Sequence, residues 1–303
     1  MNAIRYSTWG CILVTSVVLH LSGCSTSQSN KSAASDLQKA LTFHAPFDGS
    51  ADAAFARGDR TLYSAPSMKQ APVGTPGLPA SGVVSLARGQ GRFGDALHFH
   101  KKSPEMVFYR GEKNIDYQTQ DWSGTVSFWL RVDPDKELEP GFCDMIQITP
   151  RAWNDAAFFV EFEKRTNSAP FRFGAYADFK VWNPENREWG KIPFNEKPLV
   201  TVDHPPFSGD RWTHVVFTFS NFNTKRNDGM AKLYLNGQFQ GAVTGKEQTF
   251  TWDPGKCLIM LGLSYVGFFD DLAIFNRALT EPEIQTLHQL KEGTRSLGEP
   301  ILN

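Results

Sequence analysis

Two carboxylates on one expected strand are the first residues of this sequence that could do chemistry. Glu161 and Glu163 lie two apart in FFVEFE, residues 158–163, so both side chains would point to one strand face with Cα atoms roughly 6.5–7 Å apart. Retaining glycosidases need carboxyl groups about 5–5.5 Å apart, which this spacing could give. Alternating apolar and charged residues are also typical of any half-exposed strand, and we favour that structural interpretation.

Three tryptophan-containing stretches place aromatic rings beside amide and acid groups. The stretches are Trp153-Asn154-Asp155, Trp182-Asn183 and Trp189. A sugar presents an apolar C–H face flanked by hydroxyls, so a site that binds it needs a flat aromatic ring with short polar side chains nearby. Any single tryptophan could instead anchor its loop to the sheet, but we expect at least one of them to contact a ligand.

Histidines and cysteines give weaker signals. His98 and His100 share a strand face, but no third ligand lies at a suitable spacing, so packed or solvated roles are expected. Cys143 and Cys257 each stand at the head of an apolar run. A disulfide between them and two separately buried thiols are both open, because sequence does not supply a Cα distance. The sequence contains no Ser/His/Asp order, phosphate-binding glycine loop or Cys/His metal framework.

The composition suits one β-rich domain. The chain has 303 residues, and phenylalanine, with 24 copies, is its commonest aromatic. That length is ordinary for a single β-sandwich, and aromatic residues suit strands and a flat core between sheets. The net charge of −1 and the lack of a basic block argue against a nucleic-acid partner, which would need a patch that neutralises phosphates.

The N-terminus has the pattern of an export signal. Arg5 precedes an apolar run, residues 11–21, that is too short to span a bilayer. Leu21-Ser22-Gly23-Cys24 resembles a bacterial lipobox, in which the chain is cut before the cysteine and its sulfur receives lipid. An ordinary secretory signal that contains a cysteine is the alternative. We expect a signal peptide over residues 1–23, a lipid anchor at Cys24 and a flexible tether over residues 24–40; Ser25 after the cysteine favours the outer membrane of the cell envelope.

Short strands separated by turn signals follow the tether. The expected strands are residues 41–47, 106–110, 125–132, 144–149, 157–164, 171–177, 212–219, 231–235, 248–252, 258–262 and 267–276. Residues 57–90 and 178–206 read as long loops, the second rich in aromatic residues. One helix is expected after Thr280, with Glu283 completing a capping box and Ile284, Leu287 and Leu290 forming an apolar stripe. This pattern predicts an antiparallel two-sheet sandwich.

Three motifs add a family resemblance. Gly91–Phe99 (GRFGDALHF), Trp212–Val216 (WTHVV) leading to Lys232–Gly237 (KLYLNG), and the closing strand and helix of residues 267–290 occur in this order. Together they resemble the concanavalin A-like lectin/glucanase superfamily, specifically its LamG-like jelly rolls. The resemblance implies an all-β, two-sheet jelly roll with a short C-terminal helix over residues 41–291, followed by a tail, residues 292–303.

The resemblance also implies a cation site. Asp270 matches the aspartate of the family's closing strand, where related jelly rolls bind structural Ca²⁺ with carbonyl oxygens, here from around Pro46 and Gly91, and Asp48 could add a carboxylate. An aspartate satisfied by backbone N–H groups or by an arginine is the alternative. His214 matches a structural position of the family. The glucanase pattern of acids is only partly matched, because Glu163 takes the middle place and Arg165 the third.

The sequence therefore predicts a lipid-anchored, exported protein that binds a glycan or another surface polymer without catalysis. A glycan-cleaving hydrolase that uses Glu161 and Glu163 is one alternative. A structural or adhesive envelope protein with a protein partner is the other. Fold alone does not separate these functions.

Overall fold

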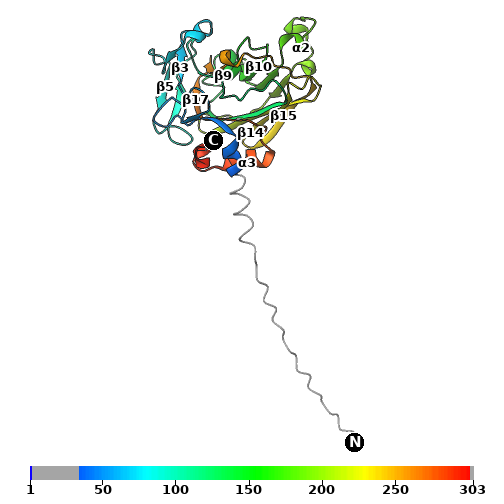
Figure 1. The fold of residues 1–303 in the computed structure, drawn as a ribbon. Coiled ribbons are helices and arrows are strands. Elements are labelled where there is room, and N and C mark those ends of the chain that lie inside the picture. Colours follow the sequence, from blue (N-terminus) through cyan, green and yellow to red (C-terminus); the bar gives the residue numbers. More distant parts are fainter. Residues whose placement is uncertain (2–33, 301–303) are drawn as a thin grey trace.

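Two antiparallel β-sheets packed face to face form the body of the protein in a computed structural model, which describes residue 1 and residues 34–300 (Figure 1). This confirms the predicted all-β sandwich with a short C-terminal helix. The predicted signal peptide from residue 2 onward, the anchor at Cys24 and the first part of the tether lie outside the described residues. Within the described part, no helix combines the length and the apolar character needed to cross a bilayer.

The first sheet has the strand order β15-β14-β13-β8-β17-β1-β2, and β6 and β5 extend it from β17. Its strands are β1 (Leu41–Ala45), β2 (Phe55–Ala56), β5 (Val84–Ala87), β6 (Ala96–Phe99), β8 (Trp122–Arg131), β13 (Thr213–Phe222), β14 (Gly229–Leu235), β15 (Gln238–Lys246) and β17 (Gly267–Phe275). The tight hairpin between β14 and β15 turns at Asn236 and Gly237, which have φ angles of 50° and 75°. Two positive φ angles suit Asn-Gly, as the sequence predicted.

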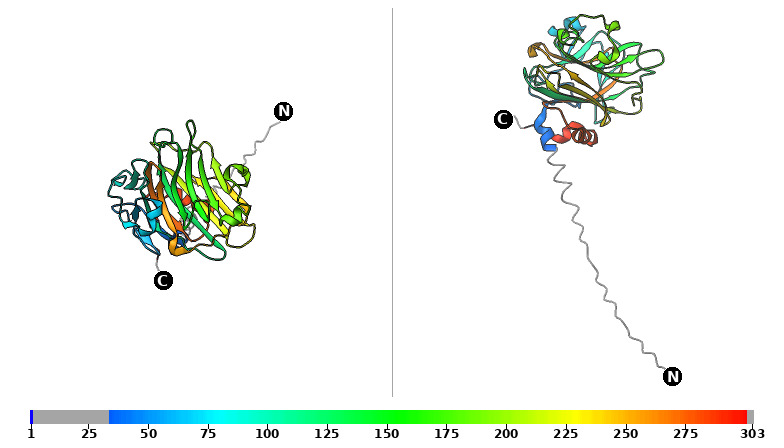
Figure 2. Two further views of the ribbon diagram at one scale, coloured as in Figure 1. Left: turned by 90° about the horizontal axis from the view of Figure 1, so that it is seen from above. Right: turned by 90° about the vertical axis from the view of Figure 1, so that its right-hand side faces the viewer.

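The second sheet has the order β12-β11-β10-β9-β16-β7-β3-β4. Its strands are β3 (Tyr63–Ala65), β4 (Thr75–Pro76), β7 (Met106–Arg110), β9 (Gly141–Thr149), β10 (Ala157–Lys164), β11 (Phe171–Tyr176), β12 (Leu199–Val202) and β16 (Leu258–Leu263). Seen from above, the middle strands of this sheet lie open between segments at its rims (Figure 2, left).

Aromatic side chains fill the space between the sheets. Trp122 of β8 is fully buried and meets Phe219 of the same sheet at 4.6 Å between ring centroids, Phe158 of the opposite sheet at 5.8 Å and Trp252 at 5.0 Å, all edge-on. Edge-to-face pairs are worth about 0.5–1.5 kcal/mol each beyond the area they bury. This cluster ties both sheets to the chain segment that carries Trp252.

The segment 248–252 is not a strand, contrary to the sequence prediction. Phe250 and Trp252 alternate into the core, but their segment does not pair with a neighbouring strand, because side chains accept hydrogen bonds from its backbone N–H groups. The Phe250 N–H donates to Asn223 Oδ1 at 2.7 Å, and the Thr251 N–H donates to Asp178 Oδ1 at 3.0 Å. The strand that pairs with β14 at the edge of the first sheet is β15, and no strand was predicted there from the sequence.

Three helical segments cover the outer face of the first sheet. They are residues 34–40, α3 (Glu281–Gln289) and the 3₁₀ helix η5 (Gly293–Leu297). Figure 1 shows residues 34–40 and α3 on the side of the molecule opposite β9 and β10. The capping box predicted at Thr280 and Glu283 begins α3.

These helical segments change two predicted boundaries, the end of the tether and the start of the C-terminal tail. Residues 34–40, expected within the flexible tether, are helical, because Leu37 and Ala40 bury their side chains in the same apolar cluster as Ile284 and Leu287. The tail expected from residue 292 also belongs to the domain as far as Leu297, which is buried in that cluster.

The two long loops contain more regular structure than predicted. Residues 57–90 include β3, β4, β5 and the 3₁₀ helix η1 (Met68–Val73). Residues 178–206 include α2 (Phe179–Trp182), η2 (Trp189–Lys191), η3 (Phe194–Glu196) and β12. Strand β12 lies between prolines, which obscure a strand signal in the sequence. It nevertheless pairs with β11, and three of its four residues are β-branched. A further 3₁₀ turn, η4 (Pro254–Lys256), precedes β16.

A β-bulge reorganises the closing strand β17. The register with β8 shifts between Asp270 and Ala273, and Asp271 has a φ of 50°. As a result Phe269, rather than Asp270, shares the inter-sheet core with Leu272 and Ile274. The sequence alternation, in which Asp270, Leu272 and Ile274 would share one face, therefore holds only from Leu272 onward.

Candidate ligand-binding cavity

Polar and aromatic side chains meet on the outer face of the second sheet because of its register. Phe159 of β10 pairs with Gln147 of β9 and Gly174 of β11. Two residues along, Glu161 pairs with Asp144 and Arg172. Side chains of paired residues lie on the same face, so these two rows of residues adjoin each other. The residues of these two rows come from three strands, β9, β10 and β11.

These rows form the floor of an open cavity of about 560 Å³. Its lining residues are Met68, Phe142, Asp144, Gln147, Ala152, Trp153, Phe159, Glu161, Arg172, Trp189, Leu263 and Ser264. The volume lies within the range of about 300–1,000 Å³ that small-molecule sites occupy, and an apolar lining with a few polar groups is typical of such sites.

Arg172 binds two carboxylates on the neighbouring strand. Its Nε donates to Glu161 Oε1 at 2.9 Å, its Nη2 donates to the same oxygen, and its Nη1 donates to Glu163 Oε2 at 2.9 Å. Arg165 also donates to Glu163. Glu161 and Arg172 are buried. The two glutamates considered for catalysis thus bind one guanidinium, and only Glu161 lines the cavity.

Asp144 is a site residue that the sequence analysis missed. It keeps some surface towards the cavity, but burial of its carboxyl raises the pKa well above the ordinary value, and the charge and hydrogen bond of Glu161 raise it further. Arg172 acts in the opposite direction, more weakly. Nothing in the residues around Asp144 signals this contact, since it arises from the register of β9 with β10.

Two buried polar groups near this floor have no hydrogen-bond partner within the described residues. One is the Nε2 of Gln147, a cavity-lining residue that is 2% exposed, and the other is the hydroxyl of Tyr176. Burial raises the pKa of Tyr176, so its hydroxyl keeps its proton at neutral pH. An unpaired buried donor costs about 1–3 kcal/mol, so a ligand that offers an acceptor to Gln147 would recover this energy.

The aromatic wall comes from two loops and the sheet. Trp153, 42% exposed, meets Trp189 edge-on at 5.3 Å between ring centroids and Tyr176 at 5.7 Å. The Phe159 ring packs against β11 at position 174, which only a glycine allows. A Cβ built on Gly174 would lie 2.3 Å from the Phe159 ring. The wall therefore leaves ring faces and edges available above a polar floor.

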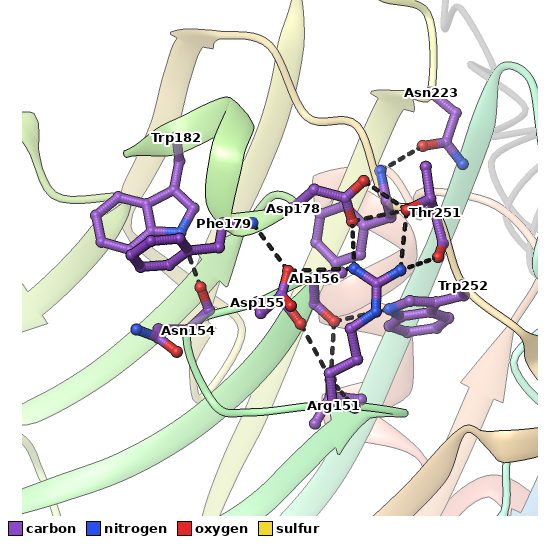
Figure 3. Close-up of polar contacts among 12 residues, drawn as sticks. Arg151, Asn154, Asp155, Ala156, Asp178, Phe179, Trp182, Asn223, Thr251 and Trp252 are labelled. Carbon is purple, nitrogen blue, oxygen red and sulfur yellow. Dashed lines mark hydrogen bonds and ion pairs between the residues drawn. The ribbon is translucent and has the colours of Figure 1, made fainter. Parts of the chain in front are cut away.

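A hydrogen-bond network holds the base of the 178–206 insertion (Figure 3). The Arg151 guanidinium donates to Asp155 at 3.2 Å, to Asp178 at 3.0 Å and to Thr251 Oγ1 at 2.9 Å. The Phe179 N–H donates to Asp155 Oδ1 at 2.9 Å, which fixes the start of α2.

The predicted ligand residues separate into two groups. Trp153 and Trp189 line the cavity. Trp182 donates its indole N–H to the Asn154 carbonyl at 2.8 Å, as Figure 3 shows, and Asn183 joins its amide to the backbone of Arg187. Trp182, Asn154 and Asn183 therefore anchor the insertion, and none of them lines the cavity.

Asp270 lies on the other sheet, in β17, under the loop Gly91–Gly94, which we call the GxxG loop. Its Oδ2 accepts from the N–H groups of Arg92 at 2.7 Å and Phe93 at 3.1 Å, and its Oδ1 accepts from the Asp271 N–H at 2.7 Å. Burial, and then the charge of Asp271, raise the pKa of Asp270 to about 8. Gly91 is required here, because a Cβ would lie 2.2 Å from the Asp95 carbonyl oxygen.

Asp48, the second predicted cation ligand, accepts the Asp95 N–H at 2.9 Å and lies 3.0 Å from Arg295. Across the described residues, no three His, Cys, Asp or Glu side chains are grouped so that they could hold a metal ion. A carbonyl-based calcium site is a different arrangement, so calcium at Asp270 and Asp48 stays a prediction.

The histidines and cysteines singled out in the sequence pack against other side chains of the protein. His98 and His100 lie 4.0 Å apart between ring centroids, and burial lowers the pKa of His98 to about 4. His214 is buried and shares a hydrogen bond with Ser127. Cys143 and Cys257 are separately buried free thiols, which is the second of the two alternatives that the sequence left open.

Comparison with known proteins agrees with this fold. Residues 112–285 match the family described as the concanavalin A-like lectin/glucanases superfamily, and the chain belongs to this family. A search of curated proteins finds no match.

Several solved structures share the fold at low sequence identity. The binding domain of Botulinum Neurotoxin DC in complex with SialylT is 14% identical with a TM-score of 0.52, over 86% of this chain and 52% of that one. The binding domain of Paraclostridial Mosquitocidal Protein 1 is also 14% identical, with a TM-score of 0.50, over 83% and 52%. Domain 4 of AbnA, an arabinanase from Geobacillus stearothermophilus in complex with arabinotriose, is 18% identical with a TM-score of 0.49, over 82% and 98%. This chain spans about half the length of the two toxin domains.

Proposed function

We propose that this protein binds glycans, without cleaving them, in the cavity on the outer face of the second sheet. The observation that carries the proposal is the pairing of exposed tryptophan surface with a polar floor that includes an unsatisfied buried amide, that of Gln147. Rings of Trp153 and Trp189 suit the C–H face of a sugar, and polar groups below them suit its hydroxyls. Glycan ligands of proteins with the same fold are consistent with this function.

The ion pairs argue against hydrolysis by Glu161 and Glu163. Both carboxylates pair with Arg172, and only Glu161 lines the cavity, so the two do not flank a common place for a scissile bond. Asp144, the acid with a raised pKa, contacts Glu161 directly, whereas glycosidases hold their acids at least about 5 Å apart around the scissile bond. Binding without cleavage therefore fits the cavity better.

We further propose that the protein is exported and lipid-anchored through Cys24. Residues 34–40 pack on the outer face of the first sheet, on the side of the molecule opposite β9 and β10 (Figure 1). The cavity is lined by residues of β9 and β10. An anchor that precedes residue 34 would thus leave the cavity facing away from the membrane, towards polymers in the surroundings.

A glycan array tests the proposed function, with the full chain in mild detergent. We expect retention of one group of glycans, and about a tenfold loss of affinity for Trp153→Ala, because each stacked ring contributes about 0.5–1.5 kcal/mol beyond its buried area. Phe239→Ala is the matched control, since Phe239 is an exposed aromatic outside the cavity.

The array result would contradict the proposal if no glycan is retained, or if both variants bind equally well. Release of new reducing ends from a bound glycan would favour the hydrolase. Selective capture of a protein in place of any glycan would favour the adhesive alternative.

A further inference from the structure

The cavity floor carries one carboxyl group that no cation neutralises. Arg172 is shared between Glu161 and Glu163, and Arg165 also pairs with Glu163. Asp144 has no ion pair with any described residue. The neighbouring strand β16 adds only Leu263 and Ser264 to the cavity, both uncharged. If Asp144 ionises, the floor therefore gains an uncompensated negative charge.

The rings around this carboxyl are suited to a cation. Phe142, Trp153, Phe159 and Trp189 all line the cavity with Asp144. Two of them already attract cations of the protein itself: Arg172 lies 5.0 Å from the Phe142 ring centroid, and Lys197, which does not line the cavity, lies 4.1 Å from that of Trp189. Aromatic rings beside a carboxylate are the surroundings in which proteins recognise ammonium groups.

Gln147 supplies a second requirement. Its Nε2 is buried, lacks a partner among the described residues and belongs to the cavity lining, so a ligand should also present a hydrogen-bond acceptor there. A sugar hydroxyl or ring oxygen meets this requirement, but a simple alkylammonium chain does not.

Resting on the proposed function, we propose that the cavity selects glycans that carry a free amino group. The ammonium lies against Asp144 between the aromatic rings, and Gln147 donates to an oxygen of the same or the adjoining sugar. Acidic sugars are disfavoured, because Arg172 is already paired with two carboxylates and a carboxylate or sulfate would face Asp144 and Glu161.

Ligand charge and protonation of Asp144 are then coupled. In the free protein, burial and Glu161 raise the pKa of Asp144, so this carboxyl tends to hold a proton. A bound ammonium favours the ionised form, so binding releases that proton. Affinity for an amino sugar should therefore rise with pH as Asp144 ionises, for as long as the ligand ammonium keeps its proton, and affinity for a neutral sugar should not.

Calorimetric titration with three oligomers of equal length tests the proposal, using glucosamine, N-acetylglucosamine and glucose units. At a mildly acidic pH, where the amines of the glucosamine oligomer are protonated, the full chain should bind this oligomer about tenfold more tightly, as expected for one charged contact. Titration in two buffers that differ in ionisation enthalpy should reveal proton release with that oligomer alone.

Asp144→Asn should remove the preference and the proton release while it retains the binding of the glucose oligomer. Asn is close in shape to a protonated aspartic acid, so folding should survive. Asp203→Asn is the matched control, because Asp203 is exposed and outside the cavity lining. If Asp144→Asn does not fold, the proton release and pH dependence of the unaltered chain decide the question.

The outcomes separate this inference from the proposed function. Failure of every oligomer and of the glycan array would overturn glycan binding itself. Equal affinity for the glucose and glucosamine oligomers would leave glycan binding standing and overturn the amino-sugar proposal. Equally tight binding of a lysine pentapeptide would also overturn it, because the cavity would then recognise the ammonium of a protein.

Discussion

Arg172 illustrates how one residue can remove the apparent chemistry of two others. The sequence presents Glu161 and Glu163 as a carboxylate pair, but Arg172, on the adjacent strand, binds both. Removal of one partner of a buried ion pair typically costs about 3–5 kcal/mol, because the remaining charge stays buried without compensation. Loss of either partner would therefore destabilise the strand pair, and Asp144 is the acid of the cavity that Arg172 does not pair with.

His214 should make the protein less stable in mild acid. Burial, and then the neighbouring His288, lower its pKa to about 3, so the folded chain keeps it neutral where the unfolded chain takes up a proton. The unfolded state then binds more protons below about pH 6.5, and stability falls as pH falls from there to about 3, by as much as about 4–5 kcal/mol.

Urea unfolding of His214→Phe at several pH values checks this prediction. The slope of unfolding free energy against pH should flatten, though only in part, because burial also lowers the pKa of His98 to about 4. His204→Phe, at an exposed position, is the control that should keep the original slope. An unchanged slope in His214→Phe would show that another group titrates.

At the scale of elements, the bulge in β17 and the GxxG loop form one unit. The bulge directs Asp270 towards the N–H groups of Arg92 and Phe93, and the glycines allow the loop to approach that closely. Oδ2 of Asp270 accepts two hydrogen bonds, but Oδ1 accepts only one, so the backbone contacts alone do not decide whether a cation binds.

Calcium at this unit would show as a dependence of melting temperature on chelator. A bound Ca²⁺ stabilises the folded state by linkage, so EDTA should lower the melting temperature of the original chain and have no effect on Asp270→Asn. Magnesium added in place of calcium is the control for general ionic effects. If EDTA leaves the original chain unchanged, the calcium prediction is wrong.

The whole molecule has one covered sheet and one open sheet. Residues 34–40 and α3 pack on the first sheet (Figure 2, right). The aromatic cavity lies on the second sheet. A protein anchored before residue 34 would use this asymmetry to keep its ligand site accessible.

Substitution of Cys24 tests that arrangement. Cys24→Ala should abolish labelling with radioactive palmitate and move the protein from the membrane fraction to the soluble fraction, because the acyl chains supply the membrane affinity. Cys11→Ala, within the apolar run, is the matched control that should remain anchored. Membrane retention of Cys24→Ala would favour an ordinary export signal over a lipid anchor.

The sequence by itself determined the class of fold. Alternating apolar residues, the Asn236-Gly237 turn and the capping box at Thr280 are local signals, because each depends on residues only a few positions apart. The same local reasoning proposed Trp153 and Trp189, because aromatic rings near short polar side chains are typical of sugar-binding sites.

Only the tertiary structure decided which residues meet. Asp144, Glu161 and Arg172 come from three strands, and a register shift beside Glu161 helps to set their alignment. Strand register depends on the packing of the whole sheet, so a local pattern cannot specify it. For the same reason residues 248–252 look like a strand but bind side chains instead, and residues 34–40 look like a tether but fold onto the first sheet.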